Sequence, residues 1–477
     1  MTERVYDLAI VGGGPAGQAA AEQAAAAGLS IAMFDEQARM GGQILRQPPR
    51  AMAVPGWLAG RSYRRLKDQL ARAEGLSRVD WFGRTSVAGV LPLGDPDGGF
   101  VLLAVPTDGG TGRRVAARRL LVAAGCYDQP VPLPGWTLPG VMSGGAIQAF
   151  VKSQRLVPGE RFVLAGTHPL QLVLADQIVA AGGTVAALLF AQTPAAMARV
   201  LAGRAPAALA QWGPLADAAA SYWRLRRAGV PIRFGRTVLE VEGDGELTAA
   251  RTGAPGGGAE AVIACDRIGL CFGFLPQADL PRSLGAQVRW AESTGGWATQ
   301  ADQWQRSDRP GLYVAGETTG VAGAPAAMEE GRIAGVAAAL DAGRTTPAEG
   351  ERLTTAARRR LTRLRRFAAL LDAIASPGDV MAGLPTDDTV VCRCEDVTRG
   401  DLLRALDGDA PPTSASALKL LTRAGMGLCQ GRGCEVPVLR LMAERKGTGV
   451  TPRDGFTPRF PVRAVPIGSI ADAADCR

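Results

Sequence analysis

The chain has 477 residues, 47% hydrophobic and 21% charged, and this length suggests about three globular domains. Its formal net charge is +8, but aromatic residues make up only 5% and no groove-reading motif occurs, which argues against nucleic acid as a partner. No uninterrupted apolar run is long enough to cross a bilayer, so we expect no transmembrane segment.

Residues 5–36 predict a strand, a glycine-rich turn, an alanine-rich helix and a second strand. Because the first strand begins by Tyr6, we expect no cleavable leader and a cytoplasmic location, where cysteines stay reduced. This strand–turn–helix–strand order is typical of a dinucleotide-binding unit.

The turn between these elements carries the G-x-G-x-x-G fingerprint. The first glycine makes the tight turn, the second admits a pyrophosphate, and the third lets the helix pack on the strand. An acid at the end of the second strand is expected to bind the adenosine ribose. The predicted binding residues are Gly12, Gly14, Pro15, Ala16, Gly17, Asp35 and Glu36.

Three later segments resemble the large flavoproteins with two dinucleotide-binding domains, the class that includes thioredoxin and glutathione reductases. They are "MGGQILR" with Gly42 and Gln43, "RRLLVAAGCYDQP" with Ala124 and Gly125, and "RPGLYVAGETTG" with Gly316 and Glu317. The resemblance implies an α/β fold and bound FAD, with the late segment at the flavin. Glu317 stands where that class usually has Asp.

Residues 160–190 repeat the strand, turn, helix and strand plan, but with Gly166, His168 and Gln171 at the three glycine positions. A side chain at His168 obstructs the closest backbone approach to a phosphate. Whether this site binds a second nucleotide, NAD(P)H or another, therefore stays open. His168 is the only histidine, and it is either a turn residue or a phosphate contact.

The chain lacks the C-x4-C and C-x-x-C pairs that disulfide reductases place beside the flavin. Cys126, Cys265 and Cys271 are interpreted as packing residues. Further along, the arginine-rich stretch 356–371 predicts a helix, with either a solvated basic face or a docking surface for an acidic partner.

Four cysteines gather in the last hundred residues as a C-x-C pair and a C-x4-C pair: Cys392, Cys394, Cys429 and Cys434. Four thiolates can hold a [2Fe–2S] cluster or a zinc ion, and the C-x-C spacing favours iron and sulfur. Thr398 can cap a following helix, and Pro437 suits the first turn of another. The module resembles the bacterioferritin-associated-ferredoxin-like domain.

Taken together, "VGGGPAG…DEQARMGGQI", "PVPLPGWTLPGVMSGGAIQAF", "VTRGDLLRAL" and "TRAGMGLCQGRGC" resemble the FAD-binding A or alpha subunit of bacterial opine oxidases and the B subunit of hydrogen cyanide synthase. These features also resemble those of related proline and hydroxyproline dehydrogenase complexes. The resemblance implies an electron-transfer subunit beside an amino-acid-oxidase-like flavoprotein subunit, and a further candidate partner is a small ferredoxin-like subunit.

No acid–base set for amine chemistry is found in the chain itself. A self-contained NAD(P)H-dependent flavin oxidoreductase and a redox-sensing scaffold stay open as alternatives.

We therefore expect two Rossmann-like domains of the glutathione/thioredoxin reductase type and a small helical [2Fe–2S] domain. The predicted boundaries are 1–150 with 270–345 for the FAD domain, 151–269 for the second nucleotide-binding-like domain, 346–384 for a basic helical connector, 385–447 for the cluster domain and 448–477 for a tail.

Overall fold

The computed structural model describes residues 4–52, 54, 57–58, 60–93 and 98–475. A five-stranded parallel sheet forms the first dinucleotide-binding unit, and its apolar strands are covered on both faces, as is usual for parallel sheets. Its strand order is β21 (Leu312–Val314), β8 (Leu120–Val122), β2 (Leu8–Val11), β3 (Ile31–Phe34) and β4 (Val79–Phe82).

Helix α1 (Pro15–Ala26) packs closely against α9 (Ala324–Asp341) beside this sheet, and α2 (Arg61–Glu74) lies next to α1. The contact depends on small residues, because a Cβ atom at Gly331 would come within 2.0 Å of the Ala16 carbonyl oxygen. The alanine-rich sequence of both helices thus permits an N-terminal and a late segment to form one domain.

A second sheet covers the same unit, in the order β1 (Val5–Tyr6), β7 (Arg113–Ala117), β6 (Phe100–Pro106) and β5 (Thr85–Pro92). Helix α14 (Ile467–Asp475), near the C-terminus, lies against β6. The end of the chain therefore returns to the first domain.

The second nucleotide-binding-like domain has its own five-stranded parallel sheet, ordered β10 (Val141–Ser143), β17 (Arg267–Cys271), β11 (Arg161–Gly166), β12 (Thr184–Phe190) and β13 (Ile232–Phe234). Strand β10 pairs in this sheet although it precedes residue 150, where the sequence places the boundary. A three-stranded antiparallel sheet adjoins it, formed by β14 (Thr237–Asp244), β15 (Glu246–Gly253) and β16 (Ala259–Ala264).

The helices of this domain are α3 (Gly144–Ala149), the π-helix Phe150–Gln154, α4 (Leu170–Ala180), α5 (Pro194–Gly203), α6 (Ala205–Ala210) and α7 (Trp212–Arg227). Short elements join it to the first domain: β9 (Cys126–Asp128) paired with β18 (Phe274–Pro276), α8 (Asp279–Ser283), β19 (Val288–Trp290) paired with β20 (Trp297–Thr299), and the 3-10 helix Gly316–Thr319.

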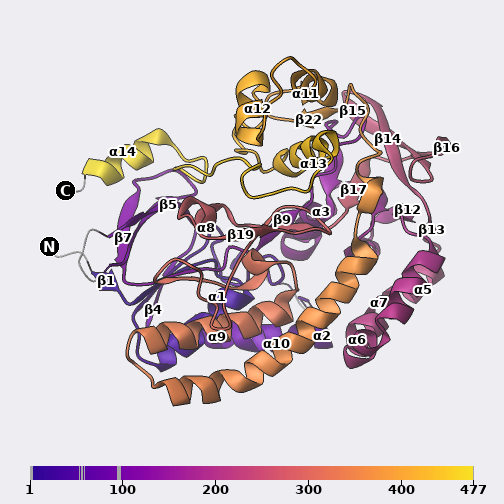
Figure 1. Cartoon of the computed structure of the whole chain (residues 1–477). Coiled ribbons are helices and arrows are strands. Elements are labelled where there is room, and N and C mark those ends of the chain that lie inside the picture. Colours follow the sequence, from indigo (N-terminus) through magenta and orange to yellow (C-terminus); the bar gives the residue numbers. More distant parts are fainter. Residues whose placement is uncertain (1–3, 53, 55–56, 59, 94–97, 476–477) are drawn as a thin grey trace.

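The connector is one long helix, α10 (Pro347–Ala375), followed by the 3-10 helix Gly378–Val380. Figure 1 shows α10 running from beneath α9 to the group of α5, α6 and α7. Its carbonyl groups at Ala369 and Ile374 accept hydrogen bonds from Arg204 and Gln192 of the second domain, both at 2.6 Å. Helix α10 therefore contacts both nucleotide-binding domains.

The cluster domain contains β22 (Val390–Cys392), β23 (Val397–Thr398), α11 (Arg399–Leu406), α12 (Ala415–Thr422) and α13 (Glu435–Lys446). In Figure 1 these helices lie on the opposite side of the molecule from α9 and α10. Their apolar core includes Trp297 and Ala278 of the first domain. The predicted fold class, two Rossmann-like units with a small helical domain, is confirmed. Within the described ranges, no helix has both the length and the apolar character that crossing a membrane requires.

Candidate functional site

One cavity of about 710 Å³ brings the two nucleotide-binding-like turns together. It is lined by every predicted nucleotide-binding residue except Gly17 and Gly166: Gly12, Gly14, Pro15, Ala16, Asp35, Glu36, Gly42, Gln43, Ala124, Gly125, His168, Gly316 and Glu317. The two remaining glycines serve close packing, because added Cβ atoms there would lie 2.0 Å from the carbonyl oxygens of Gly12 and Cys271. Their assignment as binding residues stays a prediction.

The first turn has the shape that a pyrophosphate requires. Gly12 has a φ of +113°, and a Cβ atom there would lie 2.2 Å from the Ala123 carbonyl oxygen. A Cβ at Gly17 would lie 2.0 Å from the Gly12 oxygen, so both glycines are needed for the turn itself. At Gly14 the nearest atom would be 3.7 Å away, which leaves open cavity beside the start of α1. Free N–H groups at a helix start favour an anion in that space.

The two candidate acids have different roles in the structure. Asp35 accepts hydrogen bonds of 2.7 Å from the N–H groups of Gly13 and Gln37, so its carboxylate fixes the turn. Burial raises its pKa. Glu36 is about half exposed and accepts a 3.1 Å bond from the Ser86 hydroxyl. Glu36 is therefore the better candidate for a ribose ligand.

The late segment around Gly316 is held by a buried acid that the sequence analysis missed. Glu330 of α9 accepts hydrogen bonds from the Gly316 N–H at 2.8 Å and from the Thr319 hydroxyl at 2.9 Å. Its other oxygen pairs with Arg365 of α10 at 2.9 Å. Burial raises the pKa of Glu330. An acid within the alanine-rich helix 324–341 was the available signal.

Glu317, in the same late segment, lies beside a thiol. Its carboxylate accepts a 2.7 Å hydrogen bond from Cys126 Sγ, and both residues line the cavity. Burial raises the pKa of both groups. Glu317 thus has a partner in the protein, and its predicted contact with the flavin stays a prediction.

Lys152 supplies a buried cation to the cavity and was also missed. It lies in the π-helix, and its ammonium group donates to the carbonyl oxygens of Gln43 at 2.6 Å and Ile44 at 3.2 Å. Burial lowers its pKa to about 8. No local pattern indicates this contact, because it joins residues far apart in the chain.

The second turn differs from the first because a side chain caps its helix. His168 Nδ1 accepts a 3.1 Å hydrogen bond from the Leu170 N–H at the start of α4. The imidazole packs edge-on against Phe274 with ring centroids 5.1 Å apart. One N–H group that would face a phosphate is therefore already bound.

Acidification is expected to destabilise the fold through His168. Burial lowers its pKa from 6.5 to about 4, so between these values the unfolded chain binds more protons. This contribution is present above pH 6.5 and is lost as the pH falls toward about 4. The free energy of unfolding can be measured with urea at several pH values for the wild type and for His168→Gln. Plotted against pH, the two free energies should differ in slope by up to about 1.4 kcal/mol per pH unit in this window.

Since the chain has one histidine, its imidazole resonance can also be followed directly by NMR. An imidazole that titrates near 6.5 in the folded protein would contradict the prediction.

The four predicted cluster cysteines lie in two thiol pairs. Cys392 and Cys434 interact through their side chains, as do Cys394 and Cys429, and the Cys394 thiol also lies within electrostatic range of Cys392. In the part of the chain that the structure describes, no three Cys, His, Asp or Glu side chains converge on a single ion site. Two pairs of neighbouring thiols suit a [2Fe–2S] cluster, in which two irons share four cysteines.

Backbone groups around these thiols favour a negative charge. The N–H groups of Gly425, Cys394 and Glu395 donate to Cys392. With the Cys434 thiol as donor, they lower the pKa of Cys392 to about 6. Cys434 is the N-cap of α13, so the positive end of that helix faces the thiols.

The predicted helix starts are confirmed. Thr398 caps α11 in a capping box with Asp401, and Pro437 lies in the first turn of α13. The loop between the cysteine pairs also packs tightly, since a Cβ atom at Gly427 would lie 2.1 Å from Cys394 Cβ.

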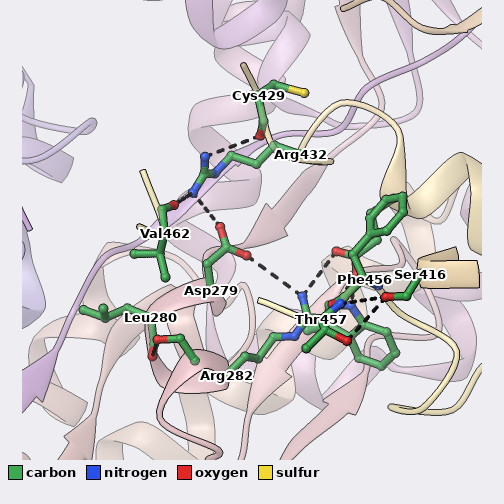
Figure 2. Close-up of polar contacts among 12 residues, drawn as sticks. Asp279, Leu280, Arg282, Ser416, Cys429, Arg432, Phe456, Thr457 and Val462 are labelled. Atoms are coloured by element: carbon green, nitrogen blue, oxygen red, sulfur yellow. Dashed lines mark hydrogen bonds and ion pairs between the residues drawn. The ribbon is translucent and has the colours of Figure 1, made fainter. Parts of the chain in front are cut away.

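Contacts of the cluster loop reach the nucleotide cavity (Figure 2). Arg432, between Cys429 and Cys434, donates to Asp279 at 2.7 Å and to the Val462 carbonyl oxygen at 2.7 Å. Arg432 and Asp279 both line the cavity. The cysteine loop therefore forms part of the wall of the dinucleotide site, a link that the sequence did not indicate.

Comparison with known proteins assigns the two parts of the chain. Residues 6–343 match the family described as "Pyridine nucleotide-disulphide oxidoreductase". The chain belongs to this family. Residues 390–444 match the "BFD-like [2Fe-2S] binding domain" family.

Relatives within this oxidoreductase family align over nearly the full length. The chain is 34% identical to the A subunit of opine oxidase from Rhizobium meliloti over 483 residues, covering 99% of each protein. It is 33% identical to the HcnB subunit of hydrogen cyanide synthase from Pseudomonas aeruginosa over 470 residues, covering 96% of this chain and 97% of that protein. The crystal structure of L-proline dehydrogenase from P. horikoshii has the same fold, with a TM-score of 0.69, 19% identity and coverage of 98% of this chain and 80% of that one.

As a member of these families, the chain is a flavin-dependent oxidoreductase with FAD and a [2Fe–2S] cluster as cofactors. The residues present fit both groups. The open space beside Gly14 suits a pyrophosphate, and the amide-lined Cys392 thiol suits an anionic cluster. The predicted FAD and [2Fe–2S] cluster are confirmed, whereas the second nucleotide and the individual ligands stay predictions.

Proposed function

We propose that this chain is the FAD- and [2Fe–2S]-containing electron-transfer subunit of a heteromeric amine or amino-acid dehydrogenase. Opine, glycine, proline and hydroxyproline types are the candidate activities. The partner would be a flavoprotein subunit similar to amino-acid oxidases that oxidises the amine, and a small ferredoxin-like subunit is a further candidate. Support comes from the relatives, which are named as subunits of opine oxidase and hydrogen cyanide synthase.

The observation that carries this proposal is the shared wall between the two sites. Arg432 belongs to the cysteine loop and lines the dinucleotide cavity, where it pairs with Asp279 of α8. A chain that passes electrons between two cofactors needs them close together and fixed. One arginine in contact with both sites supports such an arrangement.

The chain's own residues would bind, orient and shield the cofactors. The α1 start and Glu36 would hold FAD at its pyrophosphate and ribose, and Cys392, Cys394, Cys429 and Cys434 would hold the cluster. When bound, FAD exchanges electrons in pairs or singly, and the cluster exchanges them singly. Lys152 would place a positive charge beside the FAD and favour electron uptake there.

The second turn favours this relay over a self-contained NAD(P)H-dependent reductase. His168 fills the position of the second glycine and caps the helix start that would face a nicotinamide-nucleotide phosphate. Gln171, at the third glycine position, is buried and donates to the Gly166 carbonyl oxygen at 3.3 Å.

Anaerobic stopped-flow reduction tests the proposal. The isolated chain should contain flavin and cluster absorbance, and NADH or NADPH should bleach it only slowly and without saturation. The complex purified with its partner subunit should bleach rapidly with its amine substrate. Rapid, saturable bleaching of the isolated chain by NADH would instead establish a reductase, and colourless native protein would indicate a scaffold.

A further inference from the structure

The segment that follows the cluster domain, residues 456–463, crosses from the cysteine loop to the first domain; we name it the strap. At its start, the Phe456 ring packs on Gly425 and Gly431, where added Cβ atoms would lie 2.6 and 2.7 Å from the ring. The Phe456 carbonyl oxygen accepts a 2.7 Å hydrogen bond from Arg282 (Figure 2). The strap is therefore attached to the loop that carries Cys429 and Cys434.

At its other end, the strap is attached to strand β5. The Val462 N–H donates to the Ala88 carbonyl oxygen at 2.7 Å, and Phe460 packs on Gly89. Two side chains of the cysteine loop hold the same end, since Arg432 donates to the Val462 oxygen at 2.7 Å and Gln430 donates to the Pro461 oxygen at 3.0 Å. The N–H and the carbonyl group of Val462 are thus both hydrogen-bonded, which fixes the direction in which the following residue leaves the strap.

That next residue, Arg463, enters the dinucleotide cavity. Its Nε lies 3.3 Å from the Glu36 carboxylate, and its side chain is 27% exposed. Glu36 is the candidate ribose ligand at the end of β3, next to the Gly12–Gly14 turn. Since the pyrophosphate follows the ribose directly in FAD, a cation paired with Glu36 is a candidate partner for the phosphates.

The charge of Arg463 suits that position. A guanidinium carries five N–H donors in a plane and binds phosphate oxygens in pairs, so the ion pair with Glu36 leaves donors for a ligand. Arg432, the other cavity arginine near it, is paired with Asp279. Arg463 is instead paired with Glu36, which is itself expected to bind the nucleotide.

We propose that Arg463 is an FAD-binding residue that pairs with the dinucleotide pyrophosphate, and that the cysteine loop sets its position through Arg432 and Val462. Loading of the cluster and retention of FAD are then coupled, and the coupling is reciprocal. This inference rests on FAD occupying the cavity, as in the proposed function.

FAD titration of the deflavinated full-length chain tests the first part. Arg463→Met should weaken FAD binding about tenfold to hundredfold, as expected for a lost hydrogen-bonded charge. Arg463→Lys should lie between it and the wild type, because a point charge replaces the planar fork. Arg459→Met is the matched control, since Arg459 is an exposed arginine of the same strap, and it should leave FAD affinity within about twofold.

The outcomes separate this inference from the proposed function. A folded Arg463→Met protein that binds FAD as tightly as the wild type would overturn it, whereas a wild type that binds no FAD would overturn the proposed function. If Arg463→Met fails to fold, Arg463→Lys decides: unchanged affinity together with unchanged salt dependence would overturn the inference.

The coupling is tested by removing the cluster with a chelator and oxidant before the FAD titration. Cluster removal should weaken FAD binding in the wild type and should have a much smaller effect in Arg463→Met. An equal loss in both proteins would overturn the role of Arg463 as the link.

Discussion

Replacing Cys434 with serine is expected to remove the [2Fe–2S] cluster and, with FAD in excess, to leave the flavin site occupied. Cys434 is buried, it is the thiol partner of Cys392, and it is the N-cap of α13. Serine is favoured at an N-cap position but its hydroxyl is a poor iron ligand at neutral pH, so the fold should survive the change. Iron and acid-labile sulfide should fall to near zero, while flavin absorbance per chain stays unchanged as long as FAD is supplied in excess.

Cys265→Ser is the matched control, because Cys265 is a buried free cysteine outside the motif. It should keep its full iron content. Electron transfer to an acceptor should be lost only in Cys434→Ser, while reduction of the flavin by the partner subunit should persist. A Cys434→Ser protein with full iron and sulfide, or a wild type with zinc in their place, would contradict the assignment of these thiols.

Alanine at Gly12 and at Gly14 is expected to have opposite kinds of effect. Gly12→Ala should destabilise the fold by about 2–4 kcal/mol, because Gly12 has a φ of +113° and its new Cβ would lie 2.2 Å from the Ala123 oxygen. Gly14→Ala should change stability by no more than about 1 kcal/mol, since φ there is −76° and the Cβ has room. Its methyl group would project toward the phosphate position and lower FAD affinity at least about tenfold.

Thermal unfolding of both apoproteins and FAD titration of the folded variant measure these effects separately. Gly28→Ala, a positive-φ glycine with no atom near its Cβ position, controls for backbone strain alone. Gly14→Ala with wild-type FAD affinity would contradict the placement of the pyrophosphate at this turn.

The sequence was sufficient where one short segment contains the whole feature. The Gly12, Gly14 and Gly17 turn is local, since its three glycines act within one strand-to-helix connection. The cysteine pairs and the Thr398 cap are likewise defined by spacing. Such features follow from backbone geometry over a few residues.

The sequence was insufficient where residues meet only through tertiary packing. Lys152 reaches the Gln43 carbonyl oxygen, and Arg463 reaches Glu36 across nearly the entire chain. Choosing between Asp35 and Glu36 also required the structure, because only hydrogen bonds to the turn distinguish them. Strand β10 shows the same limit. It precedes the expected domain boundary at residue 150, yet it pairs with β17, more than a hundred positions later.

Helix α10 has a mechanical consequence. It is held to α9 by the Arg365–Glu330 ion pair and to the second domain by Arg204 and Gln192. The helix therefore limits movement of the two nucleotide-binding domains, or lobes, relative to each other and acts as a brace. Enzymes that swing one lobe to alternate between two reactants would be hindered by such a brace. The proposed electron-transfer role needs no such motion, because the cysteine loop already meets the FAD cavity through Arg432.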